Sequence, residues 1–291
     1  MKDLFFTVDV DRDVNIQIAG EDAAGSLDRG SGTSPRFSSS ERGLGLLLDI
    51  LDDIGMKATF FFEGRTAEVV DCARASGHCI GIHGYDHEDL TLLPDDRLDE
   101  VVSASFDAVS DNVGVPVCSR APYMNADGRV LGAFRSAGLF RDSSLYTSVG
   151  RSTEPFMIDD TIELPVPKAK DAHGKIIAAY LWPMHEGRRI LEDYTDMAVS
   201  IDGPMVLADH SWHMAETREG GVMDPEQEKR AAEQVCAILE GLIDAGYKPR
   251  VLSDLDRLGG RGTRNRLDRS RSERRTQGSF TLMTEVGPSK A

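Results

Sequence analysis

Short apolar segments alternate with longer segments of helical periodicity along most of the chain. Parallel sheets bury their strands as continuous apolar runs, so we interpret the short segments as strands. They lie at residues 4–11, 57–63, 79–83, 115–119, 139–142, 162–166, 176–181, 205–208 and 251–252. Helices are expected at residues 65–75, 95–112, 127–138 and 224–246, and a further helix should run to Gly55 behind a capping box of Ser38 and Glu41.

The order of these elements predicts the fold class. Strands that alternate with helices indicate a mainly parallel α/β sheet. About seven or eight such units favour a distorted (β/α)7-8, TIM-like barrel over an open sheet. We expect a single catalytic domain over residues 1–258, with residues 12–37 as a long loop insertion that lacks periodicity. Residues 259–291 are rich in Gly, Ser and Arg, which predicts a disordered basic tail.

Charge narrows the classes of partner. The chain has 33 Lys+Arg and 49 Asp+Glu, a formal net charge of −16. Its field repels phosphate backbones, so nucleic acid is not expected as a partner of the domain. The tail at 259–291 is the one exception, because its basic composition suits either RNA or an acidic partner. The alternative is a tail that is simply solvated. The oligomeric state is left open.

Membrane association and cysteine chemistry are not expected either. No apolar run approaches the roughly 20 residues that span a bilayer, and the N-terminal residues lack a signal-peptide pattern, so we expect a cytoplasmic protein. None of the four cysteines forms a CxxC pair, which predicts buried thiols in a reducing compartment. They are Cys72, Cys79, Cys118 and Cys236.

Two aspartates end the first predicted strand. Asp9 and Asp11 are two residues apart, so their side chains share one face of that strand. Two neighbouring carboxylates are costly unless a positive charge compensates them. The pair therefore indicates either a metal site or two carboxylates that cap the following loop.

Two histidines follow the third predicted strand. His83 and His87 are four residues apart and would face the same side if the chain turned helically there. With Asp11 as the third ligand they would form a two-histidine, one-carboxylate set for a divalent metal. Zn²⁺ is the preferred candidate, and Fe, Co, Ni or Mn also suits this set. The alternative is a pair of ordinary loop histidines.

Three further segments place polar groups at predicted strand ends. Arg120 could hold a carboxylate by two parallel hydrogen bonds, and the nearby Tyr123 N–H could point at substrate; the alternative is a surface salt bridge. Asp142 could lie beside His210 as a charged partner; the alternative for Asp142 is an N-cap or an Asx turn. His210 has the pKa range of a general acid, which an ionised Asp142 beside it would raise, while His213 competes for the role.

The strand ends are the main reason to group these residues. Each segment falls at the carboxyl end of a different predicted strand, where the active sites of parallel barrels form. Trp182 and Trp212 could stack on a sugar ring there, although core packing is the alternative role for each.

In this order the motifs resemble those of the polysaccharide deacetylase family (carbohydrate esterase family 4), which includes chitin and peptidoglycan deacetylases. The resemblance covers roughly residues 1–257 and rests on TVDVD, HGYDH, RAPY, DSSLY and LADHSW, with KATFFFEG as the strand before the second motif. The aspartates are spaced rather than adjacent, and Met124 stands where many members have Gly. The spaced form is similar to a branch with peptidoglycan deacetylases, allantoinase-like amidohydrolases and sugar-lipid deformylases.

The resemblance implies a function and a set of roles. It implies metal-dependent hydrolysis of a carbon–nitrogen bond other than a peptide bond, most simply N-deacetylation of an N-acetylated sugar or polysaccharide. Asp11, His83 and His87 would bind the metal, Asp9 would be the base, and Arg120 would orient it. Tyr123 would hold the oxyanion through its N–H and His210, charged by Asp142, would protonate the leaving amine. A small-molecule amidase or deformylase and a non-catalytic sugar-binding homologue are the alternatives.

Overall fold

The computed structural model describes residues 2–11, 37–218 and 220–255. The predicted loop at 12–37, apart from Phe37, and the predicted tail at 259–291 lie outside these residues. The predicted domain end at 258 lies outside them as well, so all three remain predictions.

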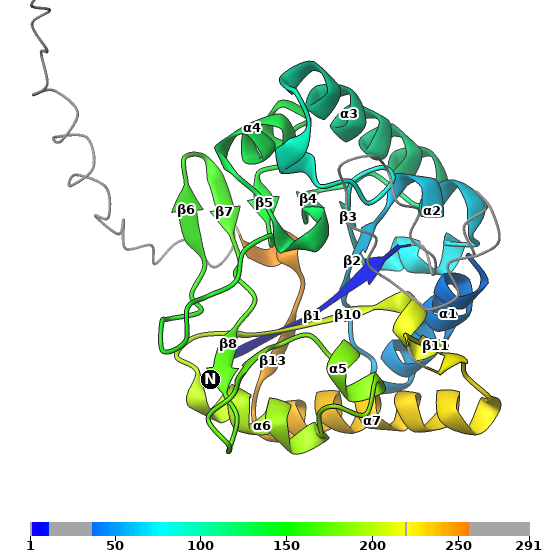
Figure 1. The fold of residues 1–291 in the computed structure, drawn as a ribbon, viewed down its shortest axis with the longest axis vertical. Coiled ribbons are helices and arrows are strands. Elements are labelled where there is room, and N and C mark those ends of the chain that lie inside the picture. Colours follow the sequence, from blue (N-terminus) through cyan, green and yellow to red (C-terminus); the bar gives the residue numbers. More distant parts are fainter. Residues whose placement is uncertain (1, 12–36, 219, 256–291) are drawn as a thin grey trace, which may run out of the picture. The chain divides into compact units, whose positions relative to one another are not determined.

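A curled sheet forms the centre of the described residues (Figure 1). Its nine strands follow the order β10-β1-β2-β3-β4-β5-β7-β6, with β13 also paired to β1. All neighbours are parallel except β6 and β7. The strands are β1 (Asp3–Val10), β2 (Thr59–Phe62), β3 (Cys79–Ile82), β4 (Cys118–Ser119), β5 (Arg141–Asp142), β6 (Phe156–Ile158), β7 (Thr161–Glu163), β10 (Met205–His210) and β13 (Lys248–Arg250).

A separate hairpin follows β7 and leads the chain to β10. The chain leaves β7 and enters β8 (Lys168–Lys170), which pairs antiparallel with β9 (Ile176–Ala178). Just after β9, Tyr180 bridges Ala208 of β10, and the Leu181 N–H donates to the Ala208 carbonyl at 2.8 Å. The distorted barrel-like α/β fold expected from the sequence is therefore confirmed, with an antiparallel hairpin in place of one regular strand–helix unit. A second, two-stranded ribbon joins β11 (Glu216–Thr217) to β12 (Gly221–Val222).

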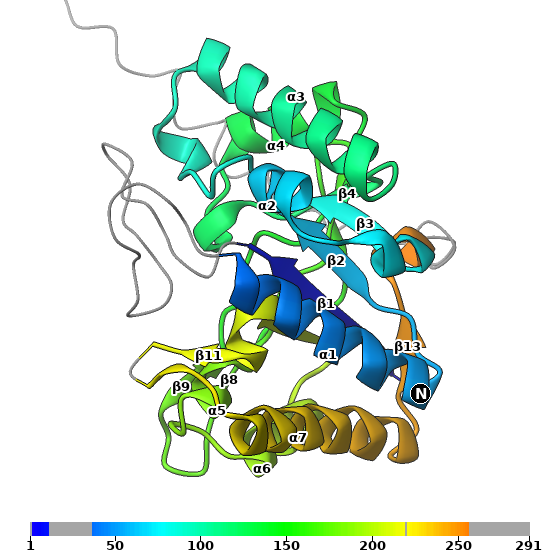
Figure 2. The ribbon, with the colours of Figure 1, turned by 90° about the vertical axis from the view of Figure 1, so that its right-hand side faces the viewer.

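Helices cover the outer side of the strands (Figures 1 and 2). The α-helices are α1 (Ser38–Ile54), α2 (Gly64–Val69), α3 (Asp95–Asn112), α4 (Gly128–Ser136), α5 (Trp182–His185), α6 (Leu191–Ser200) and α7 (Pro225–Asp244). The 3₁₀ turns are η1 (Ala73–Gly77), η2 (Leu90–Leu92), η3 (Pro122–Met124), η4 (Ser211–Met214) and η5 (Leu252–Asp254). None of the described helices is long and apolar enough to cross a membrane.

Several predicted boundaries are corrected by the structure. Phe37, not Ser38, precedes α1, and no side chain caps that helix end. The helix expected at 65–75 is a short α2 followed by η1, and the last strand lies at 248–250 rather than 251–252. The α6 helix and the hairpin strands β6 and β8 were not predicted. The start of α7 is confirmed, because the Asp224 carboxylate accepts the Gln227 N–H at 2.8 Å and Pro225 follows it.

Strand β1 is the element that positions the site. It lies between β10 and β2, and its residues Leu4 to Val10 are all buried, as is Asp11 directly after it. The register pairs Asp9 with His210 on one side and with Phe61 on the other. Parallel strands end at the same edge of a sheet, so the polar carboxyl ends of β1, β3, β4 and β10 gather at one end of the buried core.

Candidate active site

Asp11, His83 and His87 come together as the sequence predicted. One ligand atom from each lies within 4.8 Å of the others, and the separation between His87 Nε2 and Asp11 Oδ2 is 3.6 Å. All three side chains are buried. Asp11 follows β1, while His83 and His87 follow β3, so the strands on either side of β2 supply the group.

The chemistry of these three side chains fits a divalent metal ion. His83 Nδ1 lies 3.0 Å from the Arg120 carbonyl, which can only accept, so Nδ1 carries the hydrogen and Nε2 keeps its lone pair. Burial lowers the pKa of His83, which keeps the imidazole in the neutral form that a metal requires. A buried carboxylate and two imidazoles match the donor set of several divalent metals.

The His83–His87 segment is a tight turn rather than the helical turn that the spacing suggested. His87 has a φ of 56°, and Gly84 has a φ of 70°. Buried Glu88 holds the turn, because its Oε2 accepts the N–H groups of Tyr85 at 3.0 Å and Asp86 at 2.9 Å. The two imidazoles still meet, with ring centroids 5.1 Å apart.

Asp9 lies beside this group in a network of strong donors. Its Oδ1 accepts from Arg120 at 2.9 Å, and its Oδ2 accepts from the Tyr180 hydroxyl at 2.6 Å. Burial raises the pKa of Asp9, but the charges of Arg120, His83 and His210 and the Tyr180 hydrogen bond outweigh burial and lower it to about 2. Asp9 is therefore an ionised, oriented carboxylate at neutral pH.

Arg120 is fully buried, which excludes the alternative of a surface salt bridge. Besides Asp9, its guanidinium donates to Thr7 Oγ1 at 3.0 Å, to the Ser143 carbonyl at 2.8 Å and to Ser143 Oγ at 2.9 Å. Its carbon also lies 4.4 Å from the centre of the Phe61 ring. Every contact fixes the orientation of the guanidinium, and through it that of the Asp9 carboxylate.

The turn after Arg120 has an unusual backbone conformation. Tyr123 has a φ of 61° and Met124 a φ of 54°. Met124, which stands where many family members have Gly, thus adopts a backbone conformation that favours glycine. The Tyr123 ring packs edge-on against His87, with ring centroids 4.6 Å apart. These contacts place Tyr123 at the site, and the oxyanion role of its N–H remains a prediction.

Asp142 and His210 are not the pair that the sequence suggested. The Asp142 carboxylate accepts from Ser119 Oγ at 2.7 Å and from the Ser144 N–H at 3.0 Å. Burial and the charges of His213 and Arg218 lower the pKa of His210 well below its usual value, against the attraction of Asp9. The expectation that Asp142 keeps His210 charged is therefore wrong, because the packing gives Asp142 other partners.

The neighbouring aromatic residues are mostly inaccessible. Trp212 is buried and stacks on His213 with ring centroids 3.6 Å apart, so the prediction that Trp212 contacts a sugar is wrong. His213 is buried too, whereas His210 is partly exposed as a residue. Trp182 is partly exposed and lies beneath the Arg218 guanidinium at 4.7 Å.

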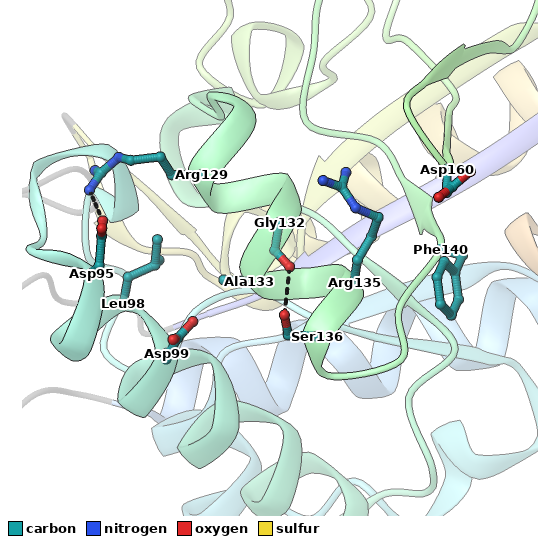
Figure 3. A pocket seen from close by; sticks show the side chains of 10 residues that line it. All are labelled: Asp95, Leu98, Asp99, Arg129, Gly132, Ala133, Arg135, Ser136, Phe140 and Asp160. Carbon is teal, nitrogen blue, oxygen red and sulfur yellow. Dashed lines mark hydrogen bonds and ion pairs between the residues drawn. The ribbon is translucent and has the colours of Figure 1, made fainter.

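A pocket of about 660 Å³ lies away from these residues, along α3 and α4 (Figure 3). Charged groups of both signs line it, and Arg129 is paired with Asp95 at 2.6 Å. None of the residues that line it belongs to the motif set described above.

The sequence interpretation missed three residues of the site. Tyr180 binds Asp9, Glu88 holds the histidine turn, and Glu163 lies next to Asp142 in the strand register. All three are buried polar groups, and Tyr180 and Glu163 interrupt apolar strand segments. A polar residue within an apolar strand is the signal that could have identified those two.

A family model described as polysaccharide deacetylase matches residues 40–140, which include His83, His87 and Arg120. Chitin deacetylase 1 of Cryptococcus neoformans is 27% identical over 186 residues, 58% of this chain and 39% of that protein. A chitin deacetylase of Colletotrichum lindemuthianum is 30% identical over 120 residues, 38% of this chain and 48% of that protein. The chain thus spans less than half the length of these curated relatives.

Solved structures share the fold at low identity. A candidate polysaccharide deacetylase from Mycobacterium smegmatis matches with a TM-score of 0.55 and 22% identity, covering 85% of this chain and 92% of that one. A family 4 carbohydrate esterase pseudoenzyme from Bacillus anthracis matches with a TM-score of 0.52 and 14% identity, over 87% and 65% of the two chains. The chain thus shares its fold with these structures, and over residues 40–140 its sequence is similar to the polysaccharide deacetylase family.

Proposed function

We propose that the protein is a metal-dependent hydrolase that removes the N-acetyl group from an N-acetylated sugar or polysaccharide. The observation that carries this proposal is the ionised Asp9, held by Arg120 and Tyr180 beside the buried group of Asp11, His83 and His87. A base next to a metal site is the arrangement that hydrolysis of an unactivated amide requires.

Asp11, His83 and His87 would hold the metal, for which Zn²⁺ is our proposal. When bound, such an ion polarises the acyl oxygen and lowers the pKa of a water molecule. Asp9 takes the proton from the attacking water, and its low pKa keeps it ionised for this step over the whole neutral range. Arg120 and Tyr180 hold the two Asp9 oxygens in place while the proton arrives.

We propose that His210 protonates the leaving amine. It ends β10 next to Asp9 in the register, and the residue is partly exposed. Its lowered pKa makes it a neutral imidazole at rest, so it would donate a hydrogen bond to the amine nitrogen and protonate it from the small charged fraction. This role no longer depends on Asp142.

The substrate class comes from the relatives. The two curated relatives described above are chitin deacetylases by name, so β-linked N-acetylglucosamine oligomers are the substrates we propose to test first. A pseudoenzyme shares the fold, so the fold alone does not carry the activity. Support for an enzyme rather than a sugar-binding protein comes from Asp9, whose buried network with Arg120 and Tyr180 lies beside the three proposed ligands.

The test is acetate release from N-acetylglucosamine oligomers by the zinc-loaded protein, measured beside hydrolysis of cyclic amides and of formylated amino sugars. We expect acetate to form in proportion to enzyme and to stop when the metal is removed by a chelator. Hydrolysis of the small cyclic amides or formamides alone would replace the proposal with a small-molecule amidase or deformylase. Sugar binding without any hydrolysis would indicate a non-catalytic homologue.

A further inference from the structure

The carboxyl groups of Asp142 and Glu163 lie on neighbouring strands, next to the strand that precedes Arg120. Asp142 ends β5, and the strand register pairs it with Glu163 at the end of β7. Paired residues of parallel strands project to the same face, and both side chains are fully buried. Two carboxylates held together away from water cannot both be ionised without a large cost.

The hydrogen bonds of Asp142 and Glu163 indicate which of their oxygens can carry a proton. Asp142 accepts from Ser119 Oγ and from the Ser144 N–H, one donor to each oxygen. Glu163 Oε1 accepts the Leu145 N–H at 2.9 Å. Glu163 Oε2 is buried, and no hydrogen-bond donor in the described part of the chain reaches it. A proton on Oε2 would satisfy this atom by donation to Asp142.

We propose, on the basis of the proposed function, that Glu163 is protonated, shares its proton with Asp142, and acts as the positioning residue for Arg120. The pair anchors the segment 143–145, because Asp142 binds its middle residue and Glu163 binds its last residue. The same segment holds Arg120 through Ser143, and it holds the Ala121 N–H through Ser144 Oγ at 2.8 Å. The shared proton therefore helps to hold Arg120 in place, and through Arg120 it helps to orient the Asp9 carboxylate.

The electrostatics agree with this assignment. Burial and the neighbouring Asp142 raise the pKa of Glu163 well above its usual value. Other titratable or charged groups near the pair include the Cys118 thiol, whose pKa is raised by burial, by Cys79 and by Asp142, and the Arg120 guanidinium. Arg120 points at Asp9 and Ser143, so it does not neutralise the second carboxyl group.

Two variants of nearly equal size test the positioning role in the zinc-loaded protein. Gln in E163Q can accept from Leu145 and donate to Asp142, so we expect kcat for acetate release to stay within about threefold of wild type. Met in E163M can do neither, and a displaced Arg120 should lower kcat by about 10²-fold with KM and bound metal unchanged. Glu192→Gln, at an exposed position of α6, is the matched control. Equal kcat for E163Q and E163M would overturn the positioning role.

The shared proton has its own measurement, which needs no substrate. A group whose folded pKa is raised contributes stability at low pH and loses it as pH rises from its unfolded pKa toward its folded pKa. The ratio of wild-type to E163Q folding constants should therefore fall about tenfold per pH unit above roughly pH 4.5. Parallel stability curves from pH 5 to 9 would show that no proton is held and would overturn the proposal.

The two measurements separate this inference from the proposed function. Wild-type protein that hydrolyses no amide but shows the pH-dependent stability ratio would contradict the proposed function and leave the shared proton supported. Active wild-type protein with parallel curves and equal variants would contradict the inference alone.

Discussion

Replacement of Asp9 by Asn is expected to lower kcat for acetate release by about 10²–10⁴-fold, the usual contribution of a general base. Asn cannot accept the proton of the attacking water, although it keeps the size of Asp9 and one oxygen for Arg120 or Tyr180. Because Asp9 is not among the three proposed ligands, bound metal should stay near the wild-type amount. Steady-state kinetics with metal analysis of the same sample measures both quantities.

The control for this variant is Asp127→Asn, which changes an exposed aspartate that caps α4 and is not among the proposed site residues. Its kcat should equal that of wild type. If D9N kept the full rate of hydrolysis while folded and metal-loaded, Asp9 would not be the base, and another group would have to be found for that role.

Replacement of Arg120 by Met is expected to lower the free energy of unfolding by about 3–5 kcal/mol, because it leaves the buried Asp9 carboxylate without its counter-charge. It also removes the donor to Thr7 and both donors to Ser143. Burial and the loss of the Arg120 charge should then raise the pKa of Asp9, so the acid limb of kcat/KM moves to higher pH. Denaturant unfolding and a pH profile measure the two effects.

Two comparisons make the Arg120 result specific. Arg120→Lys keeps a positive charge but cannot reproduce the several fixed donors, so its stability should lie between wild type and R120M. Arg129→Met removes an exposed arginine paired with Asp95 and should change stability far less. An R120M protein as stable as R129M would show that the buried ion pair with Asp9 is not formed in solution.

The sequence predicts much of the fold because its strands are apolar and its helix ends have strong local signals. Asp224 and Pro225 mark the start of α7 by side-chain chemistry that acts within one turn. The β8–β9 hairpin and α6 lack such signals, and tertiary contacts define them. The pairing of Ala169 in β8 with Ile177 in β9, and the hydrogen bond from Tyr194 on α6 to the Tyr180 carbonyl at 2.8 Å, are not revealed by the local pattern.

The site residues also divide into those that local sequence signals identify and those that only tertiary contacts define. Asp11, His83 and His87 could be grouped from the sequence because parallel strands end at one edge, whatever the details of packing. Partners within that edge depend on register and rotamer, which a single sequence does not show. Asp142 was therefore assigned to His210, whereas the register places it beside Glu163. Tyr180, the second donor to Asp9, lies far from it in the chain, and its polar group in an apolar segment gives no indication of which residue it contacts.

The most direct test of the account is the amount of divalent metal bound per chain after loading with zinc and removal of free metal. We predict about one ion per chain for wild type and for His173→Ala, which changes an exposed histidine of the β8–β9 turn. The double variant His83→Ala/His87→Ala should bind almost none, because only Asp11 of the three ligands remains. Metal that stays near one ion per chain in the double variant would contradict the proposed site.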